Sequence, residues 1–174
     1  MTTTQDIYLT FYCCSGFRAA SKLPWPRHTN MCHASMLYYQ NIIYAHRPWM
    51  SRVDTLSESN HGVLHDPEHA RSMCIDAAIS IAKLLQLYER RYGLRRVNIQ
   101  AVGITCSAAL LLIFAVVVKY PLEEGSADAA SPAVHLSTCF RALDEFGAAW
   151  ESAKQARTFL TLLQRRVRCS ASTR

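Results

Sequence analysis

Cysteine and histidine are the residue types best suited to metal binding or nucleophilic chemistry, and this 174-residue chain contains seven of each. The cysteines are widely spaced and none belongs to a C-x2-C pair, so the sequence contains no zinc ribbon or zinc finger. They are Cys13, Cys14, Cys32, Cys74, Cys106, Cys139 and Cys169.

Three of these cysteines occur within apolar patterns of helical period. Cys74, Cys106 and Cys139 each have apolar neighbours three or four residues away, where a free cysteine behaves as a small hydrophobic side chain. Nothing in the sequence places a cysteine where its thiolate would be activated. We therefore predict core thiols, and their odd number and wide spacing are typical of a reducing compartment.

Three histidines, His61, His65 and His69, are spaced by four residues, which would align them on one face of a helix. Gly62 and Pro67 interrupt any such helix. A metal site also needs a closed set of ligands, so we expect solvent-exposed loop histidines and no metal site.

Other catalytic arrangements are missing from the sequence. It contains no phosphate-binding glycine loop, no G-x-S-x-G elbow and no H-E-x-x-H motif. Adjacent carboxylates occur at 123–124, in an expected loop, and at 144–145, on an expected solvated helix face. We therefore predict that the chain is not an enzyme, with no catalytic residue and no cofactor.

The charge of the chain is mildly basic. Nineteen Lys and Arg residues against thirteen Asp and Glu residues give a net charge of +6. This surplus permits an acidic partner but does not indicate a nucleic-acid site. Arg165, Arg166 and Arg168 near the end complement the negative end of a helix dipole.

The apolar pattern predicts an all-α protein, an irregular bundle of about four to six helices around a central apolar helix at 97–120. Half of the residues are apolar, which excludes a disordered tail. We expect an irregular segment at 1–28, a helical domain at 29–168 and a tail at 169–174. Its helices should cover about 30–45, 67–93 and 131–168, with Gly147 splitting the last.

An alternative interpretation is a small single-pass membrane protein. Residues 101–118 meet the lower length limit for a membrane span, and four arginines precede them. Only 108–118 are strongly apolar, however, which is the length of a buried core helix. We therefore favour the core-helix interpretation and expect no membrane partner.

One stretch resembles a known family. Residues 36–49, MLYYQNIIYAHRPW, are similar to a signature of the fungal-specific transcription factor domain, the middle homology region of fungal zinc-cluster regulators. Its most specific part is His46-Arg47-Pro48, a helix terminator in physical terms. We expect Arg47 to cap carbonyls or to pair with an acid inside the bundle.

Further pieces of the same resemblance follow in order over about residues 22–167. Cys74, Tyr92-Gly93, Cys139 and Trp150 stand at positions similar to those of the family, and the nitrogen-assimilation and xylanolytic-activator regulators are the subgroup that it resembles.

This resemblance implies an all-α regulatory domain in the nucleus, with other regulator chains or co-regulators as partners. Relatives hold zinc in an N-terminal cluster of six cysteines that reads DNA. The spacing of the cysteines here does not supply that cluster, so the chain looks like a fragment that lacks it, and DNA would be contacted only indirectly.

Overall fold

A computed structural model describes residues 26–50, 66–95, 97–118 and 131–172 of the chain. In these residues the protein forms five α-helices and one short 3-10 helix, and no strand. The predicted all-α class is therefore confirmed. The elements are α2 (Pro26–His46), η1 (Arg47–Trp49), α3 (Pro67–Tyr92), α4 (Gln100–Val118), α5 (Pro132–Phe146) and α6 (Glu151–Ser172).

Local sequence signals set the ends of α3 and α5. The side chain of Asp66 accepts a hydrogen bond from the backbone N–H of Glu68 at 3.0 Å, and Ser131 caps α5 in the same way. A proline occupies the first position of each helix, where no N–H is needed. Gly93 ends α3 with a φ of 70°, a conformation that residues with a Cβ rarely adopt.

The first helix begins earlier than its expected cap at Thr29 or Asn30. It starts at Pro26, because the fixed φ of proline suits the first helical turn, so residues 26–28 belong to α2 rather than to an irregular segment. The rest of that segment, the loop at 51–65 and most of the loop after α4 lie outside the described residues.

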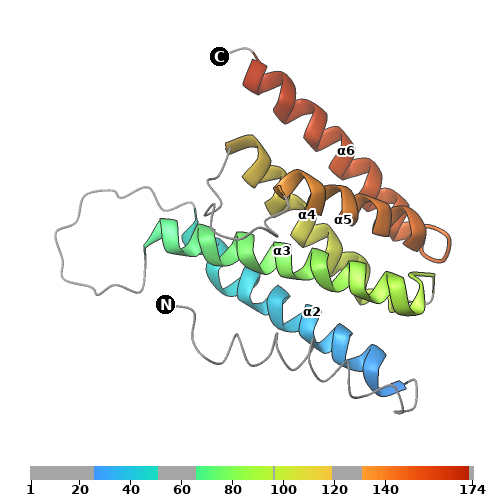
Figure 1. The fold of residues 1–174 in the computed structure, drawn as a ribbon. Helices are drawn as coiled ribbons and strands as arrows, with labels where there is room; N and C mark the ends of the chain where they lie inside the picture. The colour runs from blue at the N-terminus through green and yellow to red at the C-terminus, as the bar shows by residue number, and fades with distance from the viewer. Residues whose placement is uncertain (1–25, 51–65, 96, 119–130, 173–174) are drawn as a thin grey trace.

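The central element is α4. It packs against α2, α3, α5 and α6 (Figure 1), and Ile104, Ala108 and Leu112 are fully buried on it. The helix has no charged residue, which is typical of a helix that other helices cover on most sides. The expected apolar core helix is therefore present, within narrower bounds than 97–120.

By length and composition alone, α4 is also a candidate membrane span. Over residues 100–117, however, 56% of the helix is buried inside the bundle. A core helix of a bundle passes the same test of length and hydropathy, so this burial favours the core-helix interpretation.

The expected long C-terminal helix is split at Gly147, as its sequence indicated. α5 ends at Phe146, a short turn follows, and α6 begins at Glu151. The apolar stripe continues across the break, with Phe146, Ala153 and Leu160 buried. Beyond Leu160, no described side chain of α6 is buried, and the helix diverges from α5 (Figure 1).

One histidine of the described residues is buried between the helices. His135 on α5 is 4% exposed, and its Nδ1 has no hydrogen-bond partner among the described residues. Burial, and secondarily the positive charge of Lys83, lowers the pKa of His135. The folded protein therefore holds this imidazole in its neutral form more strongly than the unfolded chain does.

We expect Leu112→Ala to lower the free energy of unfolding by about 2–5 kcal/mol, because it opens a cavity in the core. The matched control is Leu162→Ala, since Leu162 is 59% exposed. It should change stability by less than about 0.5 kcal/mol. Urea unfolding followed by circular dichroism measures both values, and equal effects would contradict the central position of α4.

We expect Gly93→Ala to destabilise the protein by about 1–2 kcal/mol, because alanine is strained at a φ of 70°. Gly103→Ala on α4 should instead stabilise it by up to about 1 kcal/mol, because a Cβ there meets nothing within 4 Å and alanine favours the helix. Thermal unfolding of the pair gives the signs, and a stabilising Gly93→Ala would refute the assigned helix end.

We expect stability to fall as the pH drops from about 7 to about 5. Below the ordinary histidine pKa of 6.5, the unfolded chain binds the proton that folded His135 resists. His135→Leu should flatten this dependence in urea titrations at several pH values. Some slope should remain, because the pKa of His46 is also lowered. An unchanged slope in His135→Leu would show that His135 does not cause it.

Candidate functional site

The most specific motif residues lie where α2 passes into η1. His46 precedes the 3-10 helix, and the exposed Pro48 lies within it. The imidazole of His46 packs edge to face on that of His69, with ring centroids 6.1 Å apart. Burial, and secondarily the charge of His69, lowers the pKa of His46. The motif thus ends α2 and joins it to α3.

The expectation for Arg47 stays a prediction, because residues 51–65, which follow it closely, lie outside the described residues. Its side chain is exposed, and among the described residues it has neither an ion pair nor a side-chain hydrogen bond. Arg71 on α3 makes both kinds of contact, a hydrogen bond to a carbonyl oxygen and an ion pair with an acid. It donates to the carbonyl oxygen of Met50 at 3.2 Å and pairs with Glu68 at 2.5 Å. A cation from the neighbouring helix therefore caps this turn.

Cys74 connects α3 to the end of α2. Its side chain is fully buried, and Sγ donates to the carbonyl oxygen of Ile43 at 3.8 Å. Burial raises the pKa of the thiol to about 11, although the nearby charge of Arg47 acts in the opposite direction. A thiol with this pKa is protonated at neutral pH and is a packing group, not a nucleophile.

Tyr92 and Gly93 lie at the other end of α3. The ring of Tyr92 packs against that of Tyr88, with centroids 5.2 Å apart. Eighteen residues separate Cys74 from Tyr92 along one helix. At about 1.5 Å per residue this is roughly 27 Å, too far for the two motif residues to form one site.

Cys139 and Trp150 belong to the packing of α5 and α6. Cys139 is fully buried, and burial raises its pKa to about 12. The indole Nε1 of Trp150 donates to the backbone carbonyl of Val97 at 3.2 Å. Trp150 therefore attaches the start of α6 to the segment that enters α4.

The structure does not bring the eight motif residues together. The group around His46 and Cys74 lies at the α2–α3 junction, and the others lie in separate helix contacts. In the part of the chain that the structure describes, no group of three His, Cys, Asp or Glu residues could hold a metal ion. His61 and His65 lie outside that part, and His69 is exposed.

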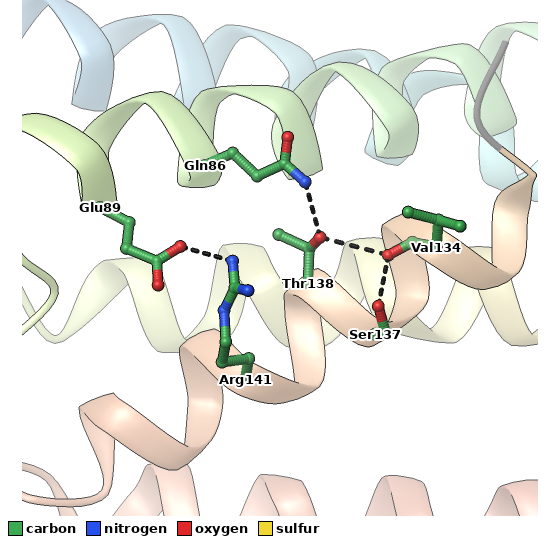
Figure 2. Close-up of polar contacts among 6 residues, drawn as sticks. All are labelled: Gln86, Glu89, Val134, Ser137, Thr138 and Arg141. Carbon is green, nitrogen blue, oxygen red and sulfur yellow. Dashed lines mark hydrogen bonds and ion pairs between the residues drawn. The ribbon is translucent and has the colours of Figure 1, made fainter.

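A polar seam between α3 and α5, shown in Figure 2, was not anticipated from the sequence. Gln86 Nε2 donates to Thr138 Oγ1 at 3.0 Å, and Arg141 pairs with Glu89 at 2.6 Å. Thr138 also donates to the carbonyl oxygen of Val134. Each of the two interhelical contacts joins residues 52 positions apart, and the second lies three residues after the first on both helices. In the sequence, only this pair of polar residues three positions apart on each of the two helices could have indicated the seam.

Comparison with known proteins gives one distant similarity. The chain is 26% identical over 129 residues to the nitrogen assimilation transcription factor nirA of Emericella nidulans. The match covers 73% of this chain and spans only 12% of the length of that relative. No family model matches the chain, and no solved structure does. The similarity supports a distant relationship to fungal transcription regulators.

Proposed function

We propose that this chain is a regulatory and interaction domain of a fungal-type transcription regulator. It acts through contacts with other parts of a regulator or with partner proteins. The observation that supports this most directly is the similarity to nirA, which extends over 73% of the chain.

The roles of the motif residues support an interaction domain rather than an enzyme. Cys74, Cys139 and Trp150 each make a packing contact or a hydrogen bond between helices. The thiols of Cys74 and Cys139 have raised pKa values, which keeps them protonated. In this proposal the motif residues stabilise the packing of the bundle, and exposed residues on its surface make the functional contacts.

DNA is contacted indirectly in this proposal. The cysteine spacing of the sequence lacks the six-cysteine pattern of a zinc cluster, and the net charge is only +6. Charge attraction alone gives weak binding that declines steeply with salt. The partners are other regulator chains or co-regulators, the location is the nucleus, and residues 29–168 form the acting domain.

We expect the full chain, fused to an unrelated DNA-binding domain, to change reporter transcription several-fold from sites for that domain. The matched control is the same fusion with Leu112→Asp, which places a charge in the core and removes the fold. Reporter activity equal to that of the control would contradict the proposed function. In gel-shift assays, tight and sequence-selective binding by the unfused chain would contradict indirect DNA contact.

A further inference from the structure

One side of α4 is only partly covered by the other helices. α3 and α5 pack on each other and on one side of α4, while α2 packs on α3 and α4, and α6 packs on α5 and α4 (Figure 1). The fully buried Ala108 and Leu112 lie on the covered side of α4. Six residues at helical spacing on the opposite side are exposed or half-buried. We call this set the α4 face, and it consists of Gly103, Cys106, Ser107, Leu110, Phe114 and Val117.

The α4 face is uncharged, and its hydroxyl group is paired. α4 contains no charged residue. Ser107 Oγ donates to the carbonyl oxygen of Gly103 at 3.0 Å, so this hydroxyl is satisfied within its own helix. Burial raises the pKa of the Cys106 thiol, which therefore stays protonated. A partner of this face must bring apolar side chains and no charge, because a buried charge without a counter-charge is costly.

The two halves of the α4 face differ in the size of their side chains. The first half carries only Gly, Cys and Ser, and a Cβ added at Gly103 would meet nothing within 4 Å. The second half carries the larger Phe114 and Val117. Leu110 lies midway, seven residues from Gly103 and seven from Val117. The first half therefore leaves space beside the helix, and the second half has side chains that could fill such a space.

We propose that the α4 face binds a second copy of this chain, with the two α4 helices packed face to face in opposite directions. A copy turned end for end about Leu110 places Val117 of one α4 against Gly103 of the other, and Phe114 against Ser107. Large side chains then fill the space beside small ones, and no charge meets a like charge on this face. This inference rests on the proposed function and identifies one of its regulator partners as the same chain.

Other occupants match the α4 face less well. A nucleic-acid backbone or an acidic peptide would find no cation on it. A lipid surface takes up a helix that presents a broad apolar side, whereas 56% of α4 over residues 100–117 is buried inside the bundle. A helix of another protein would need its own large and small residues in this same order, which a second copy provides by symmetry.

The length of the α4 face sets the strength of binding that we expect. Gly103 and Val117 are fourteen residues apart, which is about 21 Å along a helix. An interface of this length belongs with the small, transient interfaces rather than with those of permanent dimers. We therefore expect self-association with a Kd of about 10–100 µM.

The test is sedimentation equilibrium of the full chain from about 5 µM to about 500 µM, a range that spans the expected Kd. The chain should pass from monomer to dimer, and salt up to about 0.5 M should not weaken the dimer, because the face is uncharged. Gly103→Leu should raise the dimer Kd by about 10-fold or more, because the added side chain fills the space that Val117 of the other copy needs. The monomer should stay folded, because the Cβ position is open and leucine favours the helix. Circular dichroism at the lowest concentration checks that fold.

The matched control and a rescue variant make the test specific. Ala133→Leu adds a leucine at an exposed position of α5, on the other side of α4, and should leave Kd unchanged. Gly103→Leu combined with Val117→Ala should restore association, because each new leucine then faces an alanine of the other copy. A variant that has lost its fold would not regain association through a second substitution.

Three outcomes of sedimentation would overturn the proposal. They are a monomer at every concentration, a dimer that Gly103→Leu weakens no more than Ala133→Leu does, and a dimer that Val117→Ala does not restore. Neutral phospholipid vesicles that bind the chain more tightly than a second copy does would also overturn it.

The reporter fusion separates this inference from the proposed function. A chain that stays monomeric, but whose fusion changes transcription, would overturn the α4 face as a dimer site while the proposed function stands. A chain that dimerises through the α4 face, but whose fusion leaves transcription unchanged, would overturn the proposed function and leave the dimer.

Discussion

The burial of α4 is the constraint on which the rest of this structure depends. A helix with no charged side chain cannot expose a large part of its surface to water without a high free-energy cost. Four other helices therefore surround it, and their apolar stripes are covered in turn by contact with it. This one requirement explains why the other α-helices pack around α4.

Covering α4 also requires specific connections between the surrounding helices. Among these connections are hydrogen bonds donated by the thiol of Cys74, the indole of Trp150 and the amide of Gln86. Each satisfies a polar group in a place where packing alone would leave it without a partner. The residues of the resemblance motif are thus used in packing, and they are distributed over the bundle rather than gathered in a site.

For function, the consequence is that the buried motif residues serve the packing of the helices. Burial raises the pKa of the Cys139 thiol and keeps it protonated. The ring of His46 packs against the ring of His69. α6 carries exposed apolar side chains and several basic ones. The proposed function rests on the distant similarity to a transcription factor.

The sequence by itself determined the helix class, the central apolar helix and most helix ends, because caps such as Asp66, Ser131 and Gly93 act on groups within a few residues. It did not determine the long-range contacts. Arg71 reaches the turn after α2 through a contact that joins residues 21 positions apart and depends on how α3 lies on α2. Trp150 and Val97, which are 53 positions apart, meet for the same reason. Only the tertiary structure decided which apolar residues of α6 face solvent. The apolar stripe of a helix predicts which face is buried, but it does not predict how far along the helix the neighbouring helices cover that face.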